Sequence, residues 1–362
     1  MNIPPLGLIA FEVTRTCTLL CKHCRGDSRN ETYNDELSFD EIKAILDNVS
    51  TFAKPLIIIT GGEPLTRADV FDITKYSTSL GFRTVLATCG HFLTDEMVGK
   101  LIETGVSRIS VSLDGANAET HDNFRGVPGA FEAALRGLEI ARKHGLDFQI
   151  NSTITSLNID ELASLNDLAV SLGAVAFHPF LLVPMGRGSG LSDCALSPEE
   201  YEEALIRIAK SAEHSPIEIK PTCSPHYYRI IRQMSAEKKK EANVESSALP
   251  SGHGSKHRNG RTKGCLGGQG FVFLSHTGKV QICGFLEIEA GDLRTVNYDL
   301  ESIWNHSEFL RQIRDLDNYH GKCGICEFRR VCGGCRARAF HENDDYLGEE
   351  PNCIYIPEGK PQ

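Results

Sequence analysis

The sequence predicts an α/β protein in which a partial, TIM-like (β/α)6 barrel precedes a small cysteine-rich C-terminal domain. Between residues 8 and 181, six apolar runs rich in β-branched residues alternate with amphipathic stretches, the pattern of repeated βα units around a parallel sheet. Six units are too few to close an eight-stranded barrel. After residue 264, cysteines and glycines separate short strand-like pieces, and so small a core needs metal to hold it together.

Each of the six predicted strands precedes a helical stretch. The strands are Leu8–Thr14, Leu56–Thr60, Arg83–Ala87, Arg108–Ser112, Asp147–Thr153 and Val175–Leu181. A helix at Pro198–Glu213 and a short extended piece at Pro216–Lys220 follow the last of them. Two further strand-like pieces, Gly270–Leu274 and Lys279–Ile282, are predicted in the cysteine-rich part.

The composition divides the chain into three regions. They are a barrel at 1–213, a bridging region with a flexible loop at 214–263, and a C-terminal domain at 264–362. Within the bridging region, Met234–Lys263 has few apolar residues and predicts a flexible loop. The alternative is a lid that orders over an acidic substrate through four basic residues: Lys256, Arg258, Arg261 and Lys263.

Composition and charge narrow the function. In 362 residues no apolar stretch approaches the roughly 20 residues of a membrane span, and the N-terminus lacks a signal-peptide pattern, so we expect a cytoplasmic protein without a membrane partner. The net charge of −10 argues against nucleic acid as a partner. Thirteen cysteines, several closely spaced, indicate metal binding rather than disulfides in a cytosolic protein.

The first cysteine cluster follows the first predicted strand. Cys17, Cys21 and Cys24 lie within eight residues and can reach three corners of one [4Fe–4S] cube, which leaves one iron open to bind a ligand. The carboxyl ends of parallel strands are where such α/β folds gather their chemistry. Three structural thiols, or a zinc site that includes His23, is the alternative.

The spacing C-x3-C-x2-C resembles that of the radical S-adenosylmethionine (SAM) enzymes. This resemblance implies that SAM chelates the open iron, and that an electron from the cluster splits SAM into methionine and a 5′-deoxyadenosyl radical. It also implies a (β/α)6 core and an unidentified low-potential electron donor as a partner. A non-catalytic iron–sulfur electron carrier is an alternative, but it would not need the SAM-binding residues described next.

Three further stretches resemble the SAM-binding motifs of that family. Gly61-Gly62-Glu63 follows the second strand and matches the Gly-Gly-Glu-Pro motif that holds the SAM amino group. Ser112 and Asp114 end the fourth strand, where the family contacts the SAM ribose and carboxylate; an N-cap is the alternative for Asp114. Arg136 matches an arginine that pairs with the SAM carboxylate, with a solvated helix position as the alternative. Cys89 stands where many relatives have Asn.

The distal cysteines resemble the SPASM extension of radical SAM enzymes, which carries up to two auxiliary [4Fe–4S] clusters. By that motif one cluster is closed by Cys323, Cys326, Cys332 and Cys353. The other takes three ligands, Cys265, Cys283 and Cys335, and its fourth ligand is Cys223, a non-cysteine group or the substrate. Zinc ribbons are the alternative for the paired cysteines.

Whole-chain motifs resemble the tetrapyrrole-modifying branch of the SPASM enzymes. They include Phe11–Cys17 with Cys24-Arg25, Lys220–Ile230, and Gly264–Gly268 with Cys335–Ala339. The haem b-forming members of the siroheme-dependent route are the best match, which implies oxidative decarboxylation of two propionates of iron-coproporphyrin III to vinyl groups. A sibling enzyme that removes acetate groups from didecarboxysiroheme, and a SPASM peptide maturase, are the alternatives.

Such a tetrapyrrole carries four propionates, so its pocket needs guanidinium groups that grip carboxylates. Arg25, Arg187 and Arg229 are the candidates, with a surface position as the alternative for each. Four residues are candidate axial ligands of the substrate iron, and a core position is the alternative for the histidines: His178, His226, Tyr227 and Cys223. The sequence assigns no catalytic residue.

Overall fold

The computed structural model describes residues 3–241 and 263–358. Its ten strands form one sheet in the order β10-β9-β8-β1-β2-β3-β4-β5-β6-β7. All neighbours from β8 to β7 pair in parallel, whereas β8, β9 and β10 pair antiparallel. The strands are β1 Leu8–Thr14, β2 Leu56–Gly61, β3 Thr84–Thr88, β4 Ile109–Ser112, β5 Phe148–Ile154, β6 Ala176–Leu181, β7 Glu218–Ile219, β8 Phe271–Leu274, β9 Lys279–Cys283 and β10 Leu286–Asp292.

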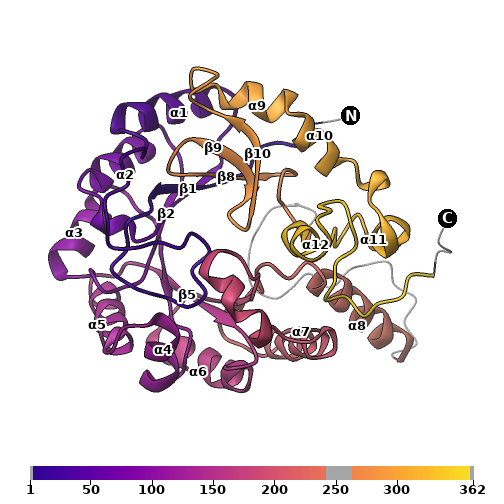
Figure 1. Cartoon of the computed structure of the whole chain (residues 1–362). Coiled ribbons are helices and arrows are strands. Elements are labelled where there is room, and N and C mark those ends of the chain that lie inside the picture. The colour runs from indigo at the N-terminus through magenta and orange to yellow at the C-terminus, as the bar shows by residue number, and fades with distance from the viewer. Residues whose placement is uncertain (1–2, 242–262, 359–362) are drawn as a thin grey trace.

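Helices surround this curved sheet and cover its outer face (Figure 1). The barrel helices are α1 Phe39–Phe52, α2 Val70–Ser79, α3 Asp95–Glu103, α4 Ala118–Arg125, α5 Ala130–Lys143, α6 Leu162–Leu172, α7 Pro198–Ala212 and α8 Tyr227–Glu241. The C-terminal helices are α9 Leu300–His306, α10 Glu308–Arg314, α11 Gly321–Ile325 and α12 Arg336–Asn343. The predicted (β/α)6 pattern is therefore present, with each of the six strands within one residue of its predicted start and end.

Local sequence explains where the helices begin. At α1, the Ser38 side chain accepts from the Glu41 backbone N–H while the Glu41 carboxylate accepts from the Ser38 N–H, a reciprocal capping box. Ser197 and Glu200 repeat this arrangement at α7, with Pro198 in the first turn. Four apolar residues of α1 recur at helical spacing and are buried in the core: Ile42, Ile45, Leu46 and Val49.

The C-terminal strands extend the barrel sheet. β8 pairs in parallel with β1, with Leu8 opposite Phe271 and Phe11 opposite Leu274. Figure 1 shows β8, β9 and β10 continuing the sheet past β1, with α9 beside α1. Buried residues of the barrel and of this hairpin, such as Ile9 and Val272, belong to one hydrophobic core. The two pieces predicted here are strands, but β10 and the pairing with β1 were not predicted.

The predicted loop from Met234 to Lys263 is wrong at its start, because α8 continues to Glu241. Few apolar residues suggested a loop, yet Ala, Glu and Lys are strong helix formers. The lid residues Lys256, Arg258 and Arg261 lie outside the described residues. Lys263 is described, and its Nζ donates to Gln269 Oε1 at 2.6 Å.

Among the helices of residues 3–241 and 263–358, none combines the length and the apolar character that a membrane span requires.

Candidate active site and cysteine groups

A cavity lies at the carboxyl ends of the barrel strands. Cys17, Cys21 and Cys24, in the loop after β1, line it together with Gly61-Gly62 at the end of β2 and Ser112 at the end of β4. The structure therefore brings together residues from three segments that the sequence assigned to one SAM site. Burial raises the pKa of Cys17 to about 12, so metal binding there must displace a proton.

Gly61 and Gly62 allow β2 to pack closely against the cysteine loop. A Cβ atom on Gly61 would lie 2.5 Å from the carbonyl oxygen of Thr14, and one on Gly62 would lie 2.5 Å from those of Arg15 and Thr16. The backbone N–H groups of Gly62 and Glu63 donate to the carbonyls of Thr14 and Thr16 at 2.8 Å. The glycines thus set the position of the cysteine loop. The sequence predicted only that they let the backbone approach a ligand closely.

Glu63 lies directly behind the cavity wall. Its carboxylate is fully buried and accepts hydrogen bonds from Thr88 Oγ1 at 2.9 Å, the Cys89 N–H at 2.7 Å and the Leu65 N–H at 3.0 Å. Burial raises the pKa of Glu63. Thr88 and Cys89 themselves line the cavity, so Glu63 fixes the end of β3 beside the cysteine loop.

Asp114 is fully buried and acts through a neighbouring arginine. Its Oδ2 lies 2.6 Å from Arg125 Nη2, and its Oδ1 accepts from the Thr153 N–H at 2.7 Å. Arg125 lines the cavity and donates through Nη1 to the Sγ of Cys21 at 3.5 Å. Burial would lower the pKa of Arg125, but the charge of Asp114 raises it above its usual range. The cavity thus has a fixed positive charge at the cysteine loop.

The structure shows where Asp114 and Arg136 lie relative to α4 and the cavity. Asn117, not Asp114, caps α4, since its side chain accepts from the Thr120 N–H at 3.0 Å. Arg136 is exposed on α5 and does not line the cavity. Arg125 was not predicted, and its only sequence signal is its place at the end of a helix terminated by Gly126 in the left-handed conformation.

His23 lies on the same side of the cavity. Its ring stacks on Phe124 with centroids 4.6 Å apart, and its Nε2 lies 3.7 Å from Asp114 Oδ2. Burial lowers the pKa of His23 to about 4. The imidazole is therefore neutral at pH 7.

Arg25, which directly follows Cys24, also lines the cavity. Its Nη2 donates to Glu12 Oε1 at 3.1 Å, and its guanidinium lies over the Phe273 ring at 4.4 Å from the centroid. Burial would raise the pKa of Glu12, but Arg25, with His276, lowers it to about 2. His276 Nδ1 lies 2.9 Å from Glu12 Oε2. This contact joins the turn after β8 to β1.

Arg187 fastens the cysteine loop from the segment after β6. Its Nε donates to the Cys21 carbonyl at 3.0 Å, and its Nη1 donates to Asp27 Oδ1 and to the Ser28 carbonyl, both at 2.8 Å. Its Nη2 is buried and has no hydrogen-bond partner among the described residues. Arg187 lines the cavity, so its guanidinium adds positive charge to the cavity wall.

The rest of the cavity wall is largely apolar. It is formed by β6, the segment after it and the turn after β9: Phe180, Leu181, Leu182, Val183 and Phe285. His178, also on β6, is half-buried, its Nδ1 is 3.1 Å from Gln149 Nε2, and it does not line the cavity. The structure therefore separates His178 from the predicted substrate contacts.

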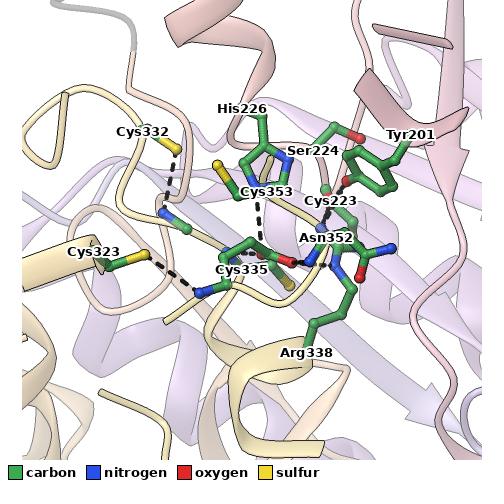
Figure 2. A network of polar contacts seen from close by, with 12 residues as sticks. Tyr201, Cys223, Ser224, His226, Cys323, Cys332, Cys335, Arg338, Asn352 and Cys353 are labelled. Atoms are coloured by element: carbon green, nitrogen blue, oxygen red, sulfur yellow. Dashed lines mark hydrogen bonds and ion pairs between the residues drawn. The ribbon is translucent and has the colours of Figure 1, made fainter. Parts of the chain in front are cut away.

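A second cavity is lined by four cysteines near the C-terminus. We call Cys323, Cys326, Cys332 and Cys353 the terminal cysteine group. Two of its thiols accept backbone hydrogen bonds, Cys332 from the Gly334 N–H and Cys323 from the Glu350 N–H, both at 3.4 Å (Figure 2). Such N–H donors stabilise thiolates.

A third set of thiols lies where the β8–β9 hairpin meets α12. We call Cys265, Cys283 and Cys335 the hairpin cysteine group. Burial raises the pKa of the Cys283 thiol to about 12, with the Cys335 and Cys265 thiols adding to the shift. Cys223 belongs beside them, because these three thiols also raise its pKa beyond the effect of burial. Cys223 has a φ of +56°, uncommon for a non-glycine residue.

His226 and Arg229 lie at the second cavity and not at the first. Both line it beside the terminal cysteine group. Arg229 pairs with Glu202 and donates to Gln233 Oε1 at 2.6 Å, while burial lowers the pKa of His226 to about 3. Tyr227 is half-buried at the start of α8. These predicted substrate residues are thus separated from Arg25 and Arg187.

The cysteines supply thiolate donors without converging on one point. Across residues 3–241 and 263–358, no three His, Cys, Asp or Glu side chains converge tightly enough to hold one metal ion. Four cysteines line each of the two cavities, whereas the three thiols of the hairpin cysteine group line neither. Thiolates are ligands of [4Fe–4S] clusters as well as of zinc.

Comparison with known proteins agrees with this donor set. Residues 11–169 match the radical SAM superfamily. Over 350 residues the chain is 49% identical to the AdoMet-dependent heme synthase of Methanosarcina barkeri, with 97% of each chain covered. The chain belongs to the radical SAM family of AdoMet-dependent heme synthases. This radical SAM protein is also 31% identical over 367 residues to the Fe-coproporphyrin III synthase of the same organism, covering 97% of this chain and 88% of the relative.

Solved structures show the same fold. Streptococcus suis SuiB bound to S-adenosylmethionine superposes with a TM-score of 0.70 at 15% identity, covering 98% of this chain and 77% of SuiB. The predicted fold class and the predicted membership of the radical SAM enzymes are confirmed. As a member of this family, the protein uses a [4Fe–4S] cluster and SAM in haem biosynthesis.

Proposed function

We propose that this radical SAM protein oxidatively decarboxylates two propionates of iron-coproporphyrin III to vinyl groups and so forms haem b. The observation that carries the proposal is the first cavity, where Arg25 and Arg187 line the same space as Cys17, Cys21 and Cys24. The 49% identity to a heme synthase supports it, against 31% to an Fe-coproporphyrin III synthase. The deacetylase and peptide-maturase alternatives have no comparable support.

In this proposal Cys17, Cys21 and Cys24 hold the SAM-binding cluster, Gly61, Gly62 and Ser112 line the space for SAM, and Glu63 supports the wall behind it. Asp114 acts on this site through Arg125, whose N–H faces the Cys21 thiolate. Bound to the reduced cluster, SAM supplies a 5′-deoxyadenosyl radical. The buried Arg125 charge offsets the negative charge of the thiolates and favours the SAM carboxylate nearby.

The remaining cavity residues bind and orient the tetrapyrrole. Arg187 has an unpartnered buried N–H group among the described residues, and Arg25 is held in place by Glu12. A guanidinium grips a carboxylate with two parallel hydrogen bonds, so these arginines hold propionates. The apolar wall from Phe180 to Val183, with Phe285, suits the flat face of the macrocycle and excludes water.

Each decarboxylation leaves one electron over, so the reaction needs an electron acceptor. One hydrogen atom leaves the propionate carbon attached to the ring, the carboxylate leaves as carbon dioxide, a vinyl group forms, and one electron remains. In this proposal the terminal and hairpin cysteine groups would hold two auxiliary [4Fe–4S] clusters, which would supply an electron acceptor. Cys223 lies against the hairpin group and is our candidate for its fourth ligand.

The test uses anaerobically reconstituted protein with dithionite, SAM and iron-coproporphyrin III. We expect haem b with two 5′-deoxyadenosines per product. Each step should lower the neutral mass by one carbon dioxide and two hydrogens, one abstracted from the side chain and one that was the carboxyl proton. Unchanged iron-coproporphyrin III together with loss of acetate groups from didecarboxysiroheme would assign the sibling activity. If neither tetrapyrrole bound, a peptide substrate would replace this proposal.

A further inference from the structure

A buried ion pair lies between the two C-terminal cysteine groups. Arg338 Nε is 2.9 Å from Glu350 Oε1, and the two side chains are 4% and 0% exposed. Burying both charges carries a desolvation cost. The contacts of the pair indicate what it does there.

Glu350 contacts one cysteine of each group. Its Oε2 accepts a hydrogen bond from the backbone N–H of Cys335, in the hairpin group, at 2.5 Å. Its own backbone N–H donates to the Sγ of Cys323, in the terminal group, at 3.4 Å. Figure 2 shows this network, with Cys323 and Cys332 on its left and Tyr201 on its right. A single residue therefore connects the two groups.

Arg338 prevents this carboxylate from moving. Its Nη2 donates to the Tyr201 hydroxyl and to the Cys223 carbonyl, both at 2.7 Å. Tyr201 is on barrel helix α7, whereas Arg338 is in the first turn of α12, one turn after Cys335. The pair is thus held from the barrel as well as from the C-terminal region. A fixed charge in such a poorly solvated place acts strongly on its neighbours.

We infer that the Glu350–Arg338 pair positions the loops of both cysteine groups and sets the reduction potentials of both auxiliary clusters together. The inference rests on the proposed auxiliary clusters. Cluster potentials respond to nearby charge and to hydrogen bonds on the sulfurs. Removing the carboxylate charge should favour reduction of both clusters, and removing the guanidinium charge should disfavour it.

The first experiment compares Glu350→Gln with the wild type by anaerobic redox titration followed by EPR. The amide keeps the shape of the side chain, an acceptor oxygen and the backbone donor to Cys323, but removes the charge. We expect both auxiliary potentials to move upward while the SAM-binding cluster keeps its potential. Glu308→Gln is the matched control, since Glu308 is 61% exposed on α10 and loses the same charge; it should change no potential.

Arg338→Gln gives the opposite sign. It should lower both auxiliary potentials, because it leaves the negative charge of Glu350 in place. A purely structural role would reduce cluster content without shifts of opposite sign in the two variants. The inference is wrong if fully loaded Glu350→Gln moves neither potential or only one, or if both variants shift in the same direction.

Iron content separates this inference from the proposed function. If wild-type protein contained about four irons per chain in place of about twelve, the proposed auxiliary clusters would not exist. Unchanged potentials in a fully loaded Glu350→Gln variant would overturn only the inference. If this variant fails to load, Arg338→Gln decides alone, and a fall in both potentials supports the inference whereas no change overturns it. Failure of both variants to load would assign the pair a structural role only.

Discussion

Arg125 Nη2 lies 2.6 Å from Asp114 Oδ2, and neither side chain is more than 9% exposed. The same guanidinium donates to the Sγ of Cys21. The loop after β4 and the end of α4 are thereby linked to the cysteine loop after β1. Because Asp114 reaches the site only through Arg125, we regard it as a positioning residue.

Asp114→Asn should weaken SAM cleavage without removing the cysteine ligands. It leaves the Arg125 charge buried without its partner, which costs about 3–5 kcal/mol of stability. Loss of an outer-shell partner lowers metal affinity or activity by roughly 10–100-fold, and we expect 5′-deoxyadenosine formation to fall by that factor. Glu119→Gln, at an exposed position on α4, the helix that carries Arg125, is the control. Unchanged 5′-deoxyadenosine formation in Asp114→Asn would contradict the positioning role.

Replacing Cys17, Cys21 and Cys24 together with Ala should separate SAM cleavage from the distal clusters. We expect no 5′-deoxyadenosine and a loss of about four irons per chain, because only one of three proposed clusters is removed. Iron and sulfide analysis with EPR measures this. Persistent SAM cleavage would refute the assignment of these cysteines.

Replacing Cys323 and Cys326 with Ala should have the complementary effect. The terminal cluster is lost, so iron falls by about four per chain, while slow SAM cleavage at the first cavity continues. Haem formation should stop, since the electron from the substrate loses an acceptor. Unchanged iron content would show that these cysteines hold no cluster, and stoichiometric zinc would restore the zinc-ribbon interpretation.

Arg187→Lys should weaken tetrapyrrole binding. Lysine keeps the positive charge but cannot make the fork of N–H donors that reaches a carboxylate and the cysteine loop together. We expect KM for iron-coproporphyrin III to rise roughly 10-fold, equivalent to about 1.4 kcal/mol. Arg136→Lys is the control, because Arg136 is exposed on α5. If Arg136→Lys weakened SAM binding more than Arg187→Lys does, this would support the predicted contact between Arg136 and SAM.

Glu41→Gln should make stability less dependent on acid pH. The hydrogen bond from Arg294 is the main cause that lowers the pKa of Glu41 from 4.5 to about 2. A carboxylate with a lowered folded-state pKa stabilises the fold above about pH 4.5, and this contribution disappears as the pH falls towards 2. Because the pair is partly solvated, we expect a difference of only about 1 kcal/mol at pH 7.

The measurement is the gap in thermal unfolding midpoint between wild type and Glu41→Gln. This gap should be largest at pH 7 and should shrink as the pH falls below 4.5. Glu139→Gln on α5, where the side chain is 71% exposed, should show no gap at either pH. A gap that stays constant through this range would contradict the assigned role of Glu41.

Local patterns predicted much of the fold. The strands from Leu8–Thr14 to Ala176–Leu181 alternate with amphipathic helices, and this periodicity depends only on neighbouring residues. The spacing of Cys17, Cys21 and Cys24 likewise carries its chemistry within eight residues. Residues close in sequence stay close in any fold, so the sequence alone predicted that these three cysteines lie together, as they do in the first cavity.

Contacts between distant segments required the tertiary structure. Pairing of β8 with β1 joins Phe271 to Leu8 across the chain, and no local pattern encodes such a register. Arg229 and Arg187 looked equivalent as single arginines, yet they line different cavities. Glu350 had no motif at all, and its position between Cys335 and Cys323 follows from the packing of α12 against the barrel. The sequence by itself determined the six barrel strands and the grouping of Cys17, Cys21 and Cys24; the tertiary structure decided which charges meet, because burial and pairing depend on all the segments that close around them.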